Sequence, residues 1–224
     1  NDLANYRPIT NLNTISKILE RLANKQLQEH LPMSPNFNTL QSAYRSLHST
    51  ETAMTKVVND LITTVDTGKP SLLLSLDISA AFDMLDHTRL LQRATELFGL
   101  NDNVNNWLKS YLTDRSSFVS IGNCHSTNVS RVTGVPQGSV LGPLLFSIFT
   151  TPVGRLISGF NISYHQYADD TQLYTSVDSS SSADVTRLSS CAEAVTKWHL
   201  ENCLLLNPSK TEVLVTGSSI TPQQ

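Results

Sequence analysis

The segment SLLLSLDI, at residues 71–78, decides the fold class of this 224-residue chain. It is short and almost continuously apolar, and Gly68-Lys69-Pro70 bounds it on one side. Such a run is typical of a strand that is buried on both faces. Its one charged residue, Asp77, stands near the end of the run. The sequence therefore predicts a buried sheet with a carboxylate at the end of one strand.

Helices are predicted on both sides of this strand. Apolar residues recur at helical spacing over residues 14–30, where Thr14 can act as N-cap, and over residues 50–66, which Ser49 or Thr50 can cap. Four further helices are predicted near residues 87–97, 103–112, 139–156 and 184–201. In the helix predicted at 184–201, five residues are expected to face the core: Val185, Leu188, Cys191, Val195 and Trp198.

Two hairpins and a final pair of strands complete the pattern. Their turns are Gly122-Asn123, Ala168-Asp169-Asp170-Thr171 and Asn207-Pro208. The flanking strands are predicted at 115–121, 125–133, 162–167, 172–176, 203–206 and 212–215. This order of elements indicates an α+β fold, in which helices cover a small sheet and the first 70 residues pack elsewhere.

Composition narrows the class of protein. No apolar run reaches the roughly 20 residues of a membrane helix, and the first residues lack the features of a signal peptide. Cys124, Cys191 and Cys203 show no C-x-x-C spacing, so neither a zinc site nor a disulfide framework is indicated. We therefore expect an intracellular protein with no membrane partner, and the sequence leaves open the nucleus or a cytoplasmic ribonucleoprotein. The net charge of −3 argues mildly against binding to nucleic-acid phosphates.

Three aspartates stand in apolar surroundings. Asp77 ends the buried strand, and Asp169 and Asp170 occupy the tip of a predicted hairpin. Each feature alone fits an ordinary turn or helix cap. Together they fit a metal site, because buried carboxylates require cations and hard oxygen ligands favour Mg²⁺ or Mn²⁺. From the residues alone, metal-dependent phosphoryl transfer is one function that this pattern allows.

Six short blocks stand out along the chain. They are Asn5-Tyr6-Arg7-Pro8-Ile9, Gln41-Ser42-Ala43-Tyr44-Arg45 with His48-Ser49-Thr50, Leu76-Asp77-Ile78-Ser79-Ala80-Ala81-Phe82-Asp83 with Asp86-His87, Val135-Pro136-Gln137-Gly138-Ser139-Val140-Leu141-Gly142-Pro143, Tyr167-Ala168-Asp169-Asp170 and Leu206-Asn207-Pro208-Ser209-Lys210-Thr211-Glu212. In this order they resemble the conserved blocks of the reverse transcriptases of LINE-type (non-LTR) retrotransposons. A lone Y-A-D-D is weak evidence, whereas the ordered set covers residues 5 to about 215 and is specific.

The resemblance implies a right-hand polymerase core. Its palm is a small antiparallel sheet with helices on one face, and its fingers are largely helical. The implied assignment is fingers at 1–70, the first metal-ligand strand of the palm at 71–87, a fingers/palm insertion at 88–138, palm again at 139–217 and a tail at 218–224. No thumb is expected within the chain, while endonuclease and thumb regions are expected on the full-length protein.

The resemblance also implies the metal site. Asp77 and Asp169 are then the main ligands of two Mg²⁺ (or Mn²⁺) ions, Asp170 assists them, and the backbone carbonyl of Ile78 touches a metal. Lys210 matches the residue that protonates the departing pyrophosphate. The alternative for Lys210 is an ordinary exposed lysine.

Four residues are implied to bind the incoming nucleotide. Phe82 matches the bulky side chain that blocks a ribose 2′-hydroxyl and so selects dNTPs; the alternative is a core aromatic residue. Arg7 matches a fingers residue that contacts the triphosphate, for which a guanidinium is suited. Gln137 and Gly138 match the loop that lines the nucleotide and template pocket.

The remaining implied contacts are with the primer and the template. Tyr167 packs beneath the primer end, and Lys17 and Arg45 touch template phosphate. The implied function is RNA-directed DNA polymerisation from a DNA primer and an RNA template during retrotransposition. One alternative is a truncated, catalytically inactive fragment that at most binds nucleic acid. Another is an RNA-dependent RNA polymerase, against which Phe82 argues.

Overall fold

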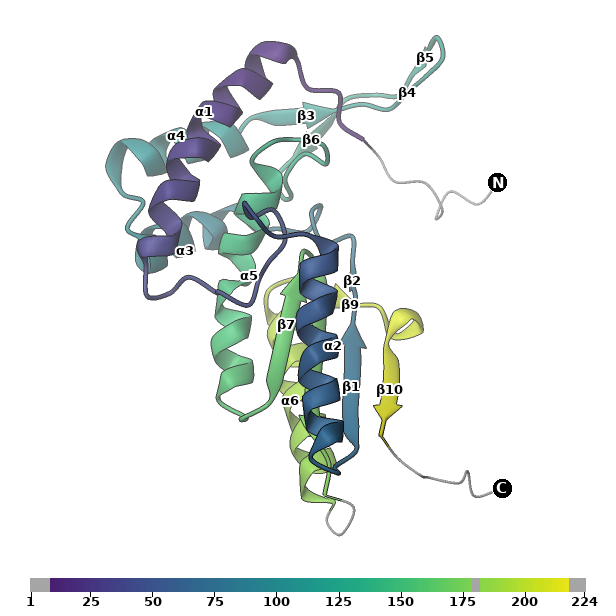
Figure 1. Cartoon of the computed structure of the whole chain (residues 1–224). Helices are drawn as coiled ribbons and strands as arrows, with labels where there is room; N and C mark the ends of the chain where they lie inside the picture. Colours follow the sequence, from purple (N-terminus) through teal and green to yellow (C-terminus); the bar gives the residue numbers. More distant parts are fainter. Residues whose placement is uncertain (1–8, 179–181, 218–224) are drawn as a thin grey trace. The chain divides into compact units, whose positions relative to one another are not determined.

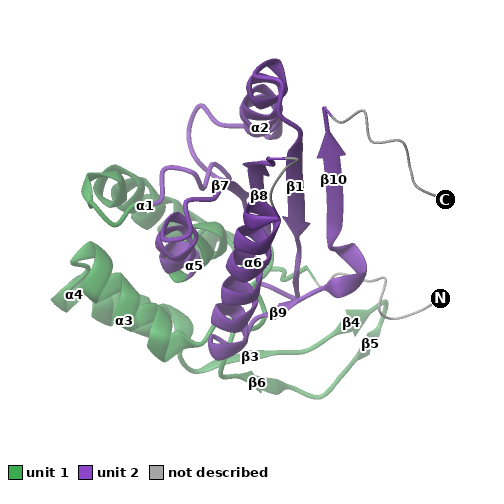
Figure 2. Cartoon of the chain, turned by 90° about the horizontal axis from the view of Figure 1, so that it is seen from below, with its two compact units in different colours: residues 1–37, 82–149 green, residues 38–81, 150–224 purple. Residues whose placement is uncertain are grey.

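The chain forms two compact units, each assembled from segments that are distant in sequence (Figure 2). Unit 1 comprises residues 1–37 and 82–149, and unit 2 comprises residues 38–81 and 150–224. The structure is a computed structural model, and it describes residues 9–178 and 182–217. Arg7 and the predicted tail at 218–224 lie outside the described residues.

A four-stranded antiparallel sheet forms the centre of unit 2, in the order β10-β1-β8-β7 (Figure 1). Its strands are β1 (Ser71–Leu76), β7 (Ser163–Tyr167), β8 (Asp170–Ser176) and β10 (Glu212–Thr216). The strand predicted at 71–78 is interrupted at Asp77, because Ile78–Ser79 leave the sheet as β2 and pair with β9 (Leu205–Leu206). Asp77 thus stands where the chain passes from one sheet to the other.

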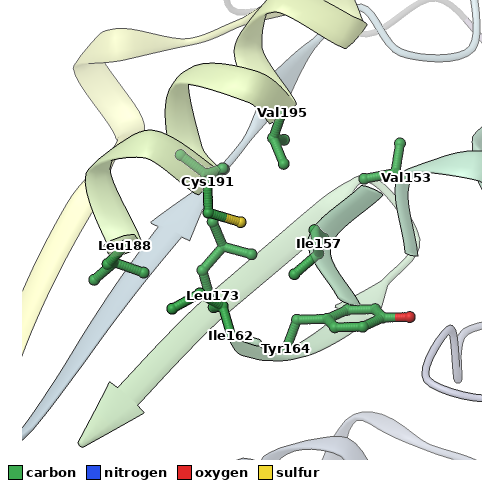
Figure 3. Packing of buried hydrophobic residues seen from close by; sticks show 9 residues of the cluster. Val153, Ile157, Ile162, Tyr164, Leu173, Leu188, Cys191 and Val195 are labelled. Atoms are coloured by element: carbon green, nitrogen blue, oxygen red, sulfur yellow. The ribbon is translucent and has the colours of Figure 1, made fainter. Parts of the chain in front are cut away.

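One face of the sheet carries the main core of unit 2. Helix α6 (Ala183–Glu201) and the part of helix α5 (Gly142–Ser158) that belongs to unit 2 contribute to it, and Figure 3 shows side chains of these helices directed toward the strands. The buried residues are Leu76, Val153, Ile157, Ile162, Tyr164, Leu173, Leu188, Cys191 and Val195. Val185 was predicted to point inward but is 45% exposed, since the buried face of α6 begins one turn later.

Helix α2 (Thr50–Asp66) packs on a smaller cluster that involves the same sheet. Val57 and Leu61 contact Tyr174 of β8, and Leu73 of β1 packs against them. Neighbours of Leu73 in β1 pack on the main core instead, as alternation along a strand requires. The prediction of helices on one face, with the first 70 residues packed elsewhere, is therefore wrong for α2. The outer apolar residues of this helix remain exposed: Met54, Val58 and Ile62.

Unit 1 is largely helical, with one β-hairpin. Its helices are α1 (Thr14–His30), the short 3₁₀ helix η2 (Leu31–Met33), α3 (His87–Phe98), α4 (Asp102–Leu112) and the first part of α5. The hairpin pairs β3 (Arg115–Ser117) with β6 (Val129–Arg131), and continues as β4 (Ser120–Ile121) and β5 (Cys124–His125). The α-helices and the hairpin turn agree with the sequence prediction, whereas η2 was not predicted. In the described part of the chain, no helix combines the length and the apolar character needed to cross a membrane.

Helix α1 has the predicted bounds but a different cap and a different buried face. Asn13, not Thr14, caps it, because the Asn13 side chain accepts a hydrogen bond from Ser16 N at 2.7 Å. The buried residues of the helix are Glu20 and Leu27. The Glu20 carboxylate accepts from the backbone N–H groups of Val140 and Leu141 at 2.7 and 3.1 Å. Of the apolar residues whose spacing predicted this helix, Leu27 is buried, whereas four are exposed: Ile15, Ile18, Leu19 and Leu22.

Candidate active site

The three predicted aspartates all lie in unit 2, at one end of its four-stranded sheet. Strands β1 and β8 are antiparallel, and their last pair is Leu76 with Thr171. One further step in this register brings Asp77 opposite Asp170. Asp169 precedes Asp170 in the turn that joins β7 to β8. The sheet therefore gathers carboxylates that are far apart in the sequence.

A two-residue turn carries Asp169. Tyr167 and Asp170 form the closing pair of the β7–β8 hairpin, and Ala168 and Asp169 connect them. Ala168 has φ +56°, a left-handed conformation that is unfavourable for a residue with a Cβ. A positive φ at the first central position is the pattern of a type II′ turn, where glycine is usual. The turn is therefore strained and needs support from its surroundings.

Gln41 supplies that support. Its Oε1 accepts from the N–H of Ala168 at 3.0 Å, and its Nε2 donates to the Ala168 carbonyl at 3.0 Å. Gln41 is only 5% exposed, so both hydrogen bonds are shielded from water. This amide clamps the two polar groups of the residue that precedes Asp169. Sequence reasoning noted the block that contains Gln41 but assigned this residue no role.

The backbone around Gln41 is itself tied to strand β7. Ser42 N donates to the Gln166 carbonyl at 3.0 Å, and Gln166 N donates to the Leu40 carbonyl at 2.9 Å. The Ser42 hydroxyl is hydrogen-bonded to Nε2 of the buried His165 at 2.8 Å. Residues 38–45, which we call the strap, therefore run along β7 and hold Gln41 at the turn.

Electrostatic interactions link the aspartates to one another. Burial of the carboxyl group raises the pKa of Asp170, the charges of Asp169 and Asp77 raise it further, and Lys210 lowers it. The residue as a whole is exposed, so its carboxyl group lies at the rim of the site, partly covered by protein. The contributions of Asp169 and Asp77 to this rise in pKa reflect carboxylates placed near one another. A cation would relieve this repulsion.

Lys210 is the nearest cation to Asp77. It lies in the short 3₁₀ helix η3 (Pro208–Lys210), and its Nζ is 3.1 Å from Asp77 Oδ2. The contact is an ion pair by distance, but its angles do not make a hydrogen bond, and the buried Oδ2 has no hydrogen-bond donor among the described residues. The Asp77 carbonyl also accepts from Asn207 N at 2.8 Å. The turn at Asn207-Pro208 thereby fixes the position of Lys210.

The residues suit a divalent metal in donor chemistry. Carboxylate oxygens are the ligands that Mg²⁺ and Mn²⁺ prefer, and the buried Asp77 Oδ2 already faces one cation, the Lys210 ammonium at 3.1 Å, without accepting a hydrogen bond among the described residues. Within the described residues, however, no three acidic, histidine or cysteine side chains are gathered into a ready-made ligand set. The side chains of Asp77, Asp169 and Asp170 would have to turn toward a shared ion.

Arg45 is another predicted site residue of unit 2, besides Ile78, which pairs with Leu206, and Tyr167, which closes the β7–β8 turn. Its Nη1 donates to the carbonyls of Thr39 and Gln41 at 2.8 and 3.2 Å, so it stabilises the strap. Tyr44, the residue before it, was not predicted as a site residue. Burial raises the pKa of Tyr44, and the charges of Asp169 and Tyr167 raise it further. Tyr44 thus belongs to the surroundings of the β7–β8 turn.

The remaining predicted residues that the structure describes lie in unit 1. The Phe82 ring packs on Phe146, with centroids 5.1 Å apart. The side-chain amide of Gln137 donates to Asp83 Oδ2 at 2.7 Å, and the backbone carbonyl of Gln137 accepts from Thr10 N at 2.8 Å.

Two more predicted residues belong to this unit. Gly138 has φ +94°, which explains glycine at this position. Lys17 lies in the first turn of α1 and is half-buried.

Comparison with known proteins supplies the family. The family described as reverse transcriptase (RNA-dependent DNA polymerase) matches residues 1–221. The chain belongs to this family. A reverse transcriptase domain explains both the order of the six sequence blocks and the concentration of carboxylates at the end of the sheet.

Several relatives of this reverse transcriptase domain come from mobile elements of Drosophila melanogaster. This chain is 33% identical over 180 residues to the RNA-directed DNA polymerase from mobile element jockey, and the match covers 78% of this chain and 19% of that protein. It is 30% identical over 211 residues to the probable RNA-directed DNA polymerase from transposon BS, covering 92% of this chain and 23% of that protein. The chain thus spans about a fifth of the length of these relatives.

A solved structure supports the fold. Apo telomerase from Candida tropicalis, truncated from its C-terminal domain, matches with a TM-score of 0.61. The match covers 93% of this chain and 41% of that chain, at 13% sequence identity. The predicted α+β polymerase fold of palm and fingers is therefore confirmed.

Proposed function

We propose that this domain is the catalytic core of an RNA-directed DNA polymerase. It transfers a deoxynucleotide from a dNTP to the 3′-hydroxyl of a DNA primer and copies an RNA template. The observation that carries this proposal is the gathering of Asp77, Asp169 and Asp170 at one end of the sheet, where burial and the charges of Asp169 and Asp77 raise the pKa of Asp170. A site that already concentrates negative charge is suited to hold cations.

The carboxylates take distinct roles in this proposal. Asp77 and Asp169 hold two Mg²⁺ (or Mn²⁺) ions, Asp170 assists, and the Ile78 carbonyl adds an oxygen ligand. The bound ions activate the primer hydroxyl and stabilise the departing pyrophosphate. Lys210, whose Nζ lies 3.1 Å from Asp77 Oδ2, carries a proton that it can donate to the pyrophosphate. Support comes from the oxygen-donor set and from the buried Asp77 oxygen that has no hydrogen-bond donor among the described residues.

The nucleotide is bound by residues of unit 1 in the same proposal. Phe82 excludes a ribose 2′-hydroxyl, and its packing on Phe146 restricts the freedom of its ring to move aside. Gln137 and Gly138 line the nucleotide and template pocket, and Arg7 contacts the triphosphate.

The polymer strands complete the proposal. Tyr167 packs beneath the primer end, and Lys17 and Arg45 contact template phosphate. The division into fingers at 1–70, palm at 71–87 and 139–217, and an insertion at 88–138 stays a prediction. The packing of α2 on the sheet shows that part of the first range contributes to the core of unit 2.

We place the domain in retrotransposition, as part of a longer protein with endonuclease and thumb regions that acts inside the cell, in the nucleus or in a cytoplasmic ribonucleoprotein. The chain spans 19% of the jockey relative and 23% of the BS relative, and this short span favours a second candidate function. This candidate is a fragment that binds nucleic acid but does not extend a primer. Extension by a longer version that includes a thumb, with none by this chain, would favour the second candidate.

The test is dNTP incorporation on an RNA template, with Mg²⁺ or Mn²⁺, by the wild-type chain and Asp169→Asn. Loss of a metal ligand removes several kcal/mol of transition-state stabilisation, so incorporation should fall by about a hundredfold or more. Asp66→Asn, an identical change at the exposed end of α2, is the matched control and should retain activity. Equal incorporation by Asp169→Asn and Asp66→Asn would refute the site.

A further inference from the structure

Two arginines face each other across the hairpin of unit 1. Arg115 of β3 and Arg131 of β6 are a register pair, and like charges placed opposite each other destabilise a hairpin. None of the ion pairs within the described part of the chain involves either guanidinium. An anion bound between the two side chains would remove the repulsion.

Both guanidiniums are held in place through one nitrogen. Arg115 Nε donates to the Tyr111 carbonyl at 2.7 Å, and the guanidinium lies 5.2 Å from the centre of the Tyr111 ring. Arg131 Nε donates to Ser117 Oγ at 2.8 Å. The terminal NH₂ groups of both residues have no hydrogen-bond partner in the described ranges. These groups are the ones that bind a phosphate in bidentate fashion.

Both arginines line the same cavity, of about 130 Å³. The polar residues Ser117 and Thr133 also line it. Asp83 is its only carboxylate, and the Gln137 amide donates to this carboxylate at 2.7 Å. The lining therefore carries two positive charges against one negative charge. Its chemistry suits an oxyanion.

An aromatic pair farther along the same hairpin favours a nucleic-acid phosphate as this oxyanion. Phe118 and His125 are in edge-to-face contact with ring centroids 5.4 Å apart, and Phe118 is 55% exposed. Phe118 follows Arg115 by three residues, roughly 10 Å along an extended chain. Phosphate-binding arginines beside an exposed aromatic ring are typical of surfaces that bind single-stranded nucleic acid, on which bases stack.

We propose that the cavity of unit 1 binds a backbone phosphate of single-stranded nucleic acid through Arg115 and Arg131, while Phe118 stacks on a base of the same strand. None of these three residues is among the predicted site residues. Only the identity of the strand, an RNA template, rests on the proposed function. The cavity is also lined by Gln137, which that function places at the template pocket.

The test measures binding alone, without dNTP or divalent metal, so it does not depend on polymerase activity. The full chain binds a labelled single-stranded oligoribonucleotide at increasing salt concentration. Each phosphate contact with a single strand contributes about 0.7 to the slope of log K against log salt. The double variant Arg115→Gln/Arg131→Gln should lower this slope by about 1.4. Across a fourfold rise in salt, its loss of affinity should be smaller than that of the wild type by roughly sevenfold.

Three further variants separate charge, stacking and folding. Arg21→Gln removes one guanidinium charge from an exposed position on α1 and should leave the slope unchanged. Arg115→Lys/Arg131→Lys keeps both charges, and should keep the slope even if its affinity falls. Phe118→Ala should weaken binding by roughly tenfold without changing the slope, because stacking releases no counterions.

Three results would overturn the proposal. The first is a double glutamine variant with the same slope as Arg21→Gln. The second is displacement of the oligoribonucleotide by millimolar inorganic phosphate at constant ionic strength, which would identify a site for an isolated anion. The third is duplex RNA that binds as tightly as the single strand and loses as much affinity in the variants, because a duplex cannot offer its bases to Phe118. Loss of primer extension in Asp169→Asn with normal RNA binding concerns the proposed function alone.

Discussion

The hydrogen bonds that Gln41 forms to the β7–β8 turn lead to a quantitative prediction. Gln41→Met keeps the length and most of the packing of the side chain but removes both hydrogen bonds to Ala168. Each such bond contributes about 0.5–1.5 kcal/mol, so the native turn loses about 1–3 kcal/mol of support. The left-handed φ of Ala168 independently costs about 1–2 kcal/mol. The variant should therefore populate other turn conformations in which Asp169 is displaced.

Primer extension and metal titration measure this effect. A loss near 2 kcal/mol corresponds to a fall in kcat of roughly thirtyfold. The Mg²⁺ concentration for half-maximal activity should rise, because the carboxylates are no longer held in place. Hydrogen exchange of the Ala168 amide provides a readout that does not require activity, and exchange should accelerate in Gln41→Met. Gln26→Met, on the exposed surface of α1, is the matched control.

A second substitution tests the role of strain. Ala168→Gly permits the positive φ without a steric penalty, so it should restore part of the activity in the Gln41→Met background. Rescue of roughly fivefold corresponds to about 1 kcal/mol. The reasoning is refuted if Gln41→Met leaves kcat, the Mg²⁺ requirement and Ala168 exchange unchanged. Absence of rescue by glycine would contradict the strained turn specifically.

Three further predictions concern other parts of the chain. Phe82→Ala should raise incorporation of NTPs relative to dNTPs by roughly tenfold or more, and unchanged selectivity in paired kinetic assays would show that Phe82 is only a packing residue. Burial, more than the nearby charge of Lys56, lowers the pKa of His165 below 6.5, so the unfolded chain binds this proton more readily than the folded one. Stability should therefore fall as the pH decreases below 6.5, and urea unfolding of His165→Gln should show a smaller fall. Glu20→Ala leaves the N–H groups of Val140 and Leu141 without their acceptor and should cost about 2–3 kcal/mol in urea unfolding, whereas a cost below about 0.5 kcal/mol would show that water replaces the carboxylate.

Local patterns predicted the elements of the fold well. Helix α2 begins at Thr50 because Ser49 and Thr52 form a reciprocal capping box, and the chain turns at Gly68 with φ +79°. The β7–β8 hairpin follows from strand-forming residues on both sides of a short polar turn. Such features depend on residues within a few positions of one another, so they can be read from the sequence.

The arrangement of these elements depends on distant partners, which local patterns do not show. The apolar stripe of α1 resembles a core face, yet most of it is exposed and a charged residue, Glu20, is buried, whose partners lie 120 and 121 residues away. Gln41 reaches Ala168 over 127 residues. The break of the strand at Asp77 likewise depends on the pairing of Ile78 with Leu206. The aspartates could be identified from the motif, whereas the side chains that position them could not.

The central claim is that Asp77, Asp169 and Asp170 hold two divalent ions at one end of the sheet. The most direct test is the anomalous scattering of Mn²⁺ in crystals of the domain with a dNTP. The account predicts two manganese peaks about 4 Å apart, with carboxylate oxygens of Asp77 and Asp169 at both. It would be contradicted if Mn²⁺ bound elsewhere with the dNTP in place, or if the two carboxylates pointed to opposite faces of the sheet.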